Sequence, residues 1–184
     1  QYVYIAAYIA GLYIIDISDN LRPIHVSTFD DRQDGRSVSV MGDLAYLLAE
    51  SGLFILDISD PLTPVIVGSC AISEYSTDIV LSDGYAYVAD WYGGLKIIDI
   101  SDPGNPTIIG SGETPWEAIA VFVDGSFAYV VDYFEDPPVQ ESGLRVFDVS
   151  DPSAPDPIGD FETYGDAHDV IIRENYAFVA NGYR

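Results

Sequence analysis

One strand and one acidic turn occur four times in this chain, and this repetition limits what the chain can fold into. The copies read GLYIIDISDN, GLFILDISDP, GLKIIDISDP and GLRVFDVSDP, and they begin at Gly11, Gly52, Gly94 and Gly143. Their first aspartates are separated by 41, 42 and 49 residues, and the longest interval contains one insertion, YFEDPPVQES at 133–142. A near-constant period of this length is typical of an array of similar structural units.

A second strand pattern precedes every copy of the first. Its copies lie at 2–6, 44–49, 85–90, 127–132 and 176–181. Four of the five follow a further apolar run such as DIVLSDG, and the acidic turns lead into short strands such as PVIVGSC. Four short strands per period, rich in β-branched and aromatic residues and bounded by Gly, Pro and Asp, predict the blade of a β-propeller. No segment has sustained helical periodicity, so the predicted fold class is all-β.

The chain is therefore predicted to be one β-propeller region, 1–184, built of four-stranded antiparallel blades. The repeats run approximately over 2–43, 44–84, 85–126 and 127–175, with a partial repeat at 176–184. About four and a half blades are present, because the second strand type occurs five times. We expect an arc of a larger ring that is completed by further blades of the same parent chain or by another subunit.

The phrase L-x-I-x-D-x-S-D-P, with YAYVAD upstream, resembles the LVIVD repeat family. The resemblance covers nearly the whole chain, although Asn20 replaces the proline in the first copy. It implies β-propeller repeats of the kind found in bacterial and archaeal proteins, often at the cell surface. The predicted location is accordingly extracellular or at the cell surface. The family has no agreed catalytic motif to transfer to this sequence.

The repeated aspartates have a structural interpretation and a metal-binding one. Asp99 ends its strand, where its carboxylate can accept hydrogen bonds from Ser101 and Asp102, and Pro103 stops the strand. The alternative is calcium, since paired carboxylates supply hard oxygen ligands. The weak calcium candidates are Asp16, Asp19, Asp57, Asp60, Asp99, Asp102, Asp148 and Asp151. They lack the D-x-D-x-D-G spacing of a loop that wraps the ion, so the structural interpretation is favoured and no cofactor is predicted.

The charge balance narrows the range of partners. The chain has 30 acidic and 7 basic residues and a net charge of −23. This charge repels nucleic acids and anionic membranes and favours cationic partners, divalent ions or high salt. No apolar stretch approaches the roughly 20 residues needed to cross a bilayer, so direct membrane insertion is not predicted. Cys70 is the single cysteine, which excludes a disulfide within the chain.

Aromatic residues are concentrated in the loops that join the second strand to the third and one blade to the next. These loops vary between repeats, whereas the acidic turns do not, so the variable loops are the better candidates for binding. The predicted ligand-binding residues are Tyr75, Trp91, Tyr92, Trp116, Tyr133, Phe134 and Tyr164. The predicted function is a non-enzymatic binding or scaffolding module that holds a protein or a glycan through this aromatic, acidic loop face.

Acidic residues in the same loops leave an enzymatic alternative open. A propeller hydrolase or lyase would use a metal-assisted acidic site formed by Asp78, Glu117, Asp166, His168 and Asp169. Carboxylates gathered around a channel could act as acid and base if their environments differed. Solvated carboxylates are the simpler interpretation in so acidic a chain. The sequence contains no G-x-S-x-G elbow and no glycine-rich phosphate loop.

Overall fold

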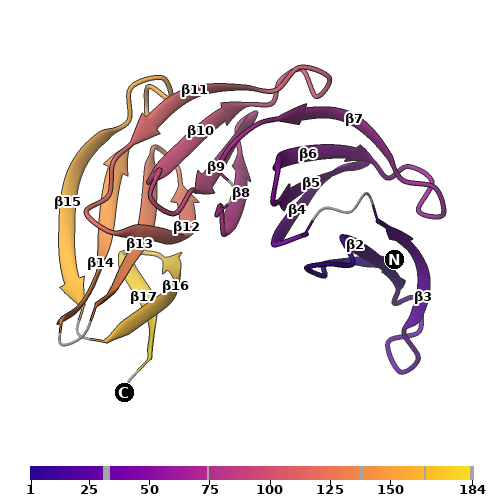
Figure 1. Ribbon diagram of the computed structural model, residues 1–184, viewed down its shortest axis with the longest axis horizontal. Helices are drawn as coiled ribbons and strands as arrows, with labels where there is room; N and C mark the ends of the chain where they lie inside the picture. The colour runs from indigo at the N-terminus through magenta and orange to yellow at the C-terminus, as the bar shows by residue number, and fades with distance from the viewer. Residues whose placement is uncertain (31–33, 74, 137–138, 164, 183–184) are drawn as a thin grey trace. The chain divides into compact units, whose positions relative to one another are not determined.

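The computed structural model describes residues 1–184 except 31–33, 74, 137–138, 164 and 183–184. The described residues form seventeen β-strands and no helix, and the strands are arranged in five antiparallel sheets (Figure 1). Within this part of the chain, no helix is long and apolar enough to cross a membrane. Two compact units are formed, one by residues 1–74 and 102–106 and the other by residues 75–101 and 107–184.

The first unit contains two sheets. The first sheet has the order β1-β2-β3, and its strands are β1 (Tyr2–Ala6), β2 (Leu12–Asp16) and β3 (Ile24–Phe29). The second has the order β4-β5-β6-β7, and its strands are β4 (Ser37–Met41), β5 (Leu44–Ala49), β6 (Gly52–Asp57) and β7 (Val65–Cys70). Leu12 and Ile14 pack with Ala45, Leu47 and Leu56 in one buried cluster. The core of this unit therefore lies between two sheet faces, as in adjacent blades.

The second unit contains three sheets. Its first sheet is formed by β8 (Asp78–Ser82), β9 (Tyr85–Ala89), β10 (Leu95–Asp99) and β11 (Thr107–Gly112). The next is formed by β12 (Glu117–Asp124), β13 (Phe127–Asp136), β14 (Val139–Asp148) and β15 (Asp156–Thr163). The last pairs β16 (Asp166–Arg173) with β17 (Tyr176–Gly182). Separate apolar clusters join the first sheet to the second and the second to the third.

The predicted blade pattern is confirmed. Each complete sheet is a meander in which consecutive strands are neighbours, and all five copies of the second strand form β-strands at the predicted places. The insertion at 133–142 does more than interrupt the repeat, because it lengthens the hairpin of β13 and β14. Tyr133 pairs with Ser142, and the register continues to Asp136 opposite Val139. Phe134 is consequently on an extended strand and not in an irregular loop.

The acidic turns contact the preceding blade. In β3 the Ser27 hydroxyl donates to the carbonyl oxygen of Pro61 over 2.5 Å. The same register position is Gly68 in β7 and Gly110 in β11. A Cβ at Gly110 would overlap the carbonyl oxygen of Pro152, and one at Gly68 would overlap that of Pro103. The repeated Ser-Asp-Pro turn is therefore an interface between blades, which explains why it varies so little.

Each acidic turn contains two successive Asx turns. The Asp99 carboxylate accepts the Ser101 amide at 2.9 Å, as predicted, and the equivalent bonds at Asp16, Asp57 and Asp148 measure 2.8–2.9 Å. The predicted bond from Asp102 to Asp99 is not found among the described residues, and the Asp102 carboxylate accepts the Gly104 amide at 3.1 Å. The Ser101 hydroxyl and amide lower the pKa of Asp99 below the ordinary carboxyl value. These bonds support the structural interpretation of the turns.

We expect Asp99→Asn to make the chain less sensitive to acid. A lowered pKa means that Asp99 stabilises the fold at pH values above about 4 and that this contribution is lost as the pH falls through the folded-state pKa. Asn keeps an oxygen acceptor but does not titrate. The loss in thermal midpoint between about pH 6 and about pH 3 should therefore be smaller in the variant than in the wild type. Asp124→Asn removes the same charge at an exposed position. An equal effect there would point to net charge instead of the turn.

Candidate functional site

The loop after β9 holds Trp91 in a defined backbone conformation. Trp91 has a φ of +47°, and it forms an isolated antiparallel bridge with Ala118 through hydrogen bonds of 3.1 and 2.9 Å. The preceding residue, Asp90, is buried and accepts the Ser76 hydroxyl at 2.6 Å. A positive φ in a bulky residue is strained and persists only where the surroundings fix it. The bridge and the buried carboxylate supply that constraint.

Trp116 is held in the segment before β12 and stacks on a ring from β13. Its amide donates to Asp132 at 3.3 Å, and its carbonyl oxygen accepts the Thr114 hydroxyl at 2.7 Å. The indole lies 4.4 Å from the Phe134 ring, centroid to centroid, with 23° between the planes. An offset stack of this kind adds to the energy of burial. The lengthened β13–β14 hairpin is what brings Phe134 to this place.

Five of the seven predicted aromatic residues form what we call the aromatic cluster: Tyr75, Trp91, Tyr92, Trp116 and Phe134. Tyr75 and Tyr92 each contact the Trp91 ring, with centroids 6.3 and 6.2 Å apart. Tyr133 instead faces His168 at 6.3 Å. Tyr164 lies outside the described residues. The two tryptophans of the chain are both in the cluster.

A cavity of about 270 Å³ opens within the aromatic cluster, and we call it the aromatic pocket. It is lined by Tyr92, Thr114, Pro115, Trp116, Glu117 and Phe134. Glu117 is the most buried polar residue of this set, with 7% of its surface exposed. Its Oε2 atom is buried and has no hydrogen-bond partner among the described residues. The lining of the pocket therefore combines aromatic rings with a buried acidic residue, one oxygen of which has no partner among the described residues.

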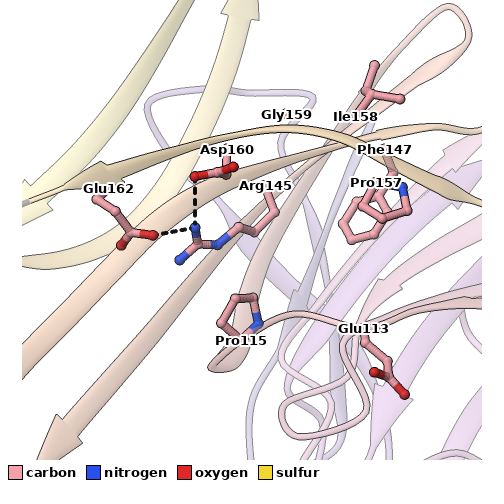
Figure 2. A pocket seen from close by; sticks show the side chains of 9 residues that line it. All are labelled: Glu113, Pro115, Arg145, Phe147, Pro157, Ile158, Gly159, Asp160 and Glu162. Atoms are coloured by element: carbon pink, nitrogen blue, oxygen red, sulfur yellow. Dashed lines mark hydrogen bonds and ion pairs between the residues drawn. The ribbon is translucent and has the colours of Figure 1, made fainter.

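A larger cavity of about 550 Å³ lies beside β14 and β15 (Figure 2). It is lined by Glu113, Pro115, Arg145, Phe147, Pro157, Ile158, Gly159, Asp160 and Glu162. Figure 2 shows the Arg145 guanidinium directed toward Asp160 and Glu162, with N–O distances of 3.8 and 2.6 Å. Pro115 lines this cavity and the aromatic pocket, so a single segment separates the two.

Arg145 and Asp132 form a buried ion pair beneath this segment. Arg145 Nε donates to Asp132 Oδ2 at 2.9 Å, and Asp132 is fully buried. Burial raises the pKa of Asp132, while the bonds from Arg145 and the Trp116 amide oppose the rise. Burial lowers the pKa of Arg145, but its bonds to Glu162 and Asp132 outweigh this effect and the net shift is upward. The pair supports Trp116 through the shared oxygen of Asp132.

The acidic residues of the enzymatic alternative have different contacts and different degrees of burial. Asp78 accepts the Ile79 amide at 2.9 Å and the Val121 amide of β12 at 3.0 Å, so it links two blades. Asp169 accepts the Val170 amide at 2.8 Å. Glu117 lines the aromatic pocket, Asp166 is buried, and His168 is exposed. Within the described ranges, no three His, Cys, Asp or Glu side chains are placed to hold one metal ion. Calcium at the acidic turns stays an untested alternative to the structural interpretation.

Solved structures of low sequence identity share the fold. A computationally designed protein, Ika4, matches with a TM-score of 0.65 and 12% identity over 82% of this chain and 86% of its own. The Cps50 (Swd1) β-propeller domain of Myceliophteria thermophila matches with a TM-score of 0.70 and 12% identity over 92% of this chain. A functionally unknown protein from Desulfotomaculum acetoxidans matches with a TM-score of 0.74 and 12% identity over 98% of this chain. The present chain spans 59% of the length of each of the last two.

The sequence itself matches a family model in five places. The model for the LVIVD repeat covers residues 1–31, 33–72, 74–114, 117–163 and 164–183. No curated protein sequence matches the chain. The five matches follow the blades, with four-stranded antiparallel sheets in the middle of the series. The chain therefore has the β-propeller fold and belongs to the LVIVD repeat family.

Proposed function

We propose that this chain is a non-enzymatic binding or scaffolding module, placed outside the cell or at the cell surface, that holds a protein or a glycan at the aromatic cluster. The observation that carries the proposal is the aromatic pocket, whose lining combines Tyr92, Trp116 and Phe134 with the buried residue Glu117. Large, rigid aromatic side chains dominate the energetics of many binding surfaces. The strong negative charge of the chain favours a basic partner over an acidic one.

The rigidity of the cluster also supports a binding role. The Trp91 bridge and the Asp132 contact fix the backbone of the two tryptophans, and each indole contacts at least one other ring of the cluster. Pre-organised side chains lose less conformational entropy on binding, which raises affinity without new contacts. The exposed Tyr92 ring remains accessible to a partner, with 80% of its surface exposed.

Intrinsic fluorescence tests this proposal directly, because both tryptophans of the chain belong to the cluster. The full chain would be titrated with a panel of soluble polysaccharides and of basic and neutral proteins. A binding member should change the emission saturably, and Trp116→Ala should weaken its binding by about tenfold or more. The matched control is Phe161→Ala, an exposed ring on β15 outside the cluster.

Two outcomes would contradict the proposal. In the first, binding would survive Trp116→Ala and Trp91→Ala unchanged, which would place the partner elsewhere. In the second, a panel member would be cleaved, and Glu117→Gln would abolish the cleavage. That result would replace the binding module with the hydrolase or lyase.

A further inference from the structure

Glu117 is a buried acidic residue, and the described residues leave one of its carboxylate oxygens without a partner. The residue begins β12 opposite Tyr133, and only 7% of its surface is exposed. Its Oε2 atom accepts no hydrogen bond from the described residues. An uncompensated carboxylate oxygen in a desolvated place is costly, and such groups usually have a partner or a function. Glu117 also lines the aromatic pocket, so a carboxylate with one unpaired oxygen stands beside this cavity.

The surroundings of Glu117 indicate the kind of partner that its carboxylate would attract. The six residues lining the aromatic pocket include no Lys, Arg or His. Arg145, the cation beneath the neighbouring segment, is already held by Asp132, Glu162 and Asp160. A compensating positive charge would therefore come from the ligand. Aromatic faces attract the same kind of ligand, since ring quadrupoles attract ammonium groups.

The size of the pocket indicates how much of a partner it holds. Its volume of about 270 Å³ is just below the range of small-molecule sites, which are typically about 300–1,000 Å³. It suits one side chain or head group better than a whole drug-sized molecule. We propose that the aromatic pocket binds an alkylammonium group, and specifically a lysine side chain presented by a protein partner. This inference rests on the proposed binding function and names the chemistry of its ligand.

Two isosteric pairs test the requirement for positive charge. The full chain would be titrated with choline and with 3,3-dimethylbutan-1-ol, which has the same shape but no charge. The peptide acetyl-Gly-Lys-Gly-amide would be titrated in parallel, at constant ionic strength, with its analogue in which 2-aminoheptanoic acid replaces lysine, so that a methyl group replaces the ammonium. Tryptophan emission should change saturably with the charged member of each pair, and the neutral member should bind about tenfold more weakly or worse.

A matched pair of variants tests the role of Glu117. Glu117→Gln keeps the shape of the side chain and removes its charge, and it should weaken binding of the lysine peptide by about tenfold or more. The control is Asp124→Asn, which makes the same change in net charge at the exposed end of the same strand. Binding by this control should stay within about twofold of wild type, because only long-range attraction is reduced. A circular dichroism melt confirms that each variant is folded.

Each outcome decides a different question. Binding of choline without the lysine peptide would restrict the site to free ammonium compounds and overturn the lysine assignment. Equal binding of charged and neutral isosteres, unaffected binding by Glu117→Gln, or no saturable response to either cation would overturn the inference. If a neutral polysaccharide then still bound and depended on Trp116, the proposed binding function would stand with a glycan as its ligand. The isostere comparison needs only the wild-type chain, so it decides the point even if Glu117→Gln does not fold.

Discussion

Arg145→Met is expected to lower the free energy of unfolding by about 3–5 kcal/mol, because it leaves the buried Asp132 carboxylate without its counter-ion. Asp132 Oδ2 accepts Arg145 Nε at 2.9 Å, and its Oδ1 atom has no partner among the described residues. Breaking a buried pair costs more than the pair contributes, since the remaining charge stays desolvated. Denaturant unfolding followed by far-ultraviolet circular dichroism measures the loss.

Lys96→Met is the matched control for this prediction. Lys96 occupies the position of Arg145 in the preceding blade, immediately after the Gly-Leu pair, and its ammonium donates to the Ser111 hydroxyl at 2.8 Å in an exposed place. The same loss of one positive charge should change the free energy of unfolding by no more than about 0.5 kcal/mol. Comparable losses in the two variants would show that net charge, and not the buried pair, is responsible.

The pH dependence of the stability loss in Arg145→Met shows whether the loss comes from an unpaired charge or from lost packing. Burial already raises the pKa of Asp132, and removal of Arg145 takes away a contact that opposes the rise. An aspartate whose pKa is raised by folding stabilises the fold at pH values below its unfolded-state pKa, about 3.9. This contribution is lost as the pH rises through the folded-state pKa. The deficit of Arg145→Met should therefore be greatest near neutral pH and smaller in acid. Adding Asp132→Asn should recover part of the stability at neutral pH. A deficit that is independent of pH would contradict the ion-pair explanation.

Gly110→Ala is expected to destabilise the chain by about 1–3 kcal/mol through overpacking between two blades. A Cβ at Gly110 would overlap the carbonyl oxygen of Pro152 in the next acidic turn, and backbone cannot move aside as a flexible side chain can. The turn or the strand must shift, and well-packed interiors transmit such a shift to their neighbours. The same denaturant titration would measure the effect.

Gly159→Ala is the corresponding control in the following blade. Gly159 occupies the same register position opposite β14, but the nearest atom to its added Cβ is the Val146 Cβ at 4.0 Å. The substitution should therefore change stability by no more than about 0.5 kcal/mol. If Gly110→Ala were equally mild, the packing of the turn against the preceding blade would not be tight.

Strand positions and turn chemistry could be predicted because both depend on neighbours in the sequence. The alternation in GLKIIDI and the Gly, Pro and Asp residues around it act over a few residues, so β10 and its turn were found without tertiary information. Repetition reinforced each prediction four times. The register shift between Ile97 and Ile98, with its equivalents in the other blades, has no comparable local signal. It follows from pairing with the outer strand.

The candidate site was predicted only in part. Variation among the loops identified Trp91, Trp116 and Phe134, but the stack of Trp116 on Phe134 depends on the hairpin extension of β13 and β14. Sequence reasoning missed Arg145 and Asp132. The available signal was the scarcity of basic residues, since only 7 occur in the chain and one of them follows the fourth Gly-Leu pair.

The sequence by itself determined that this chain is made of propeller blades, because strand period, turn residues and repeat length are local properties that recur. Only the tertiary structure decided which side chains meet. Glu117 became a buried wall of an aromatic pocket, and Asp78 became a link between two sheets. Both are acidic residues at the first position of a strand, so composition alone cannot separate them. Their different roles arise from the pairing of distant strands, which fixes whether a carboxylate meets a backbone amide, a ring or solvent.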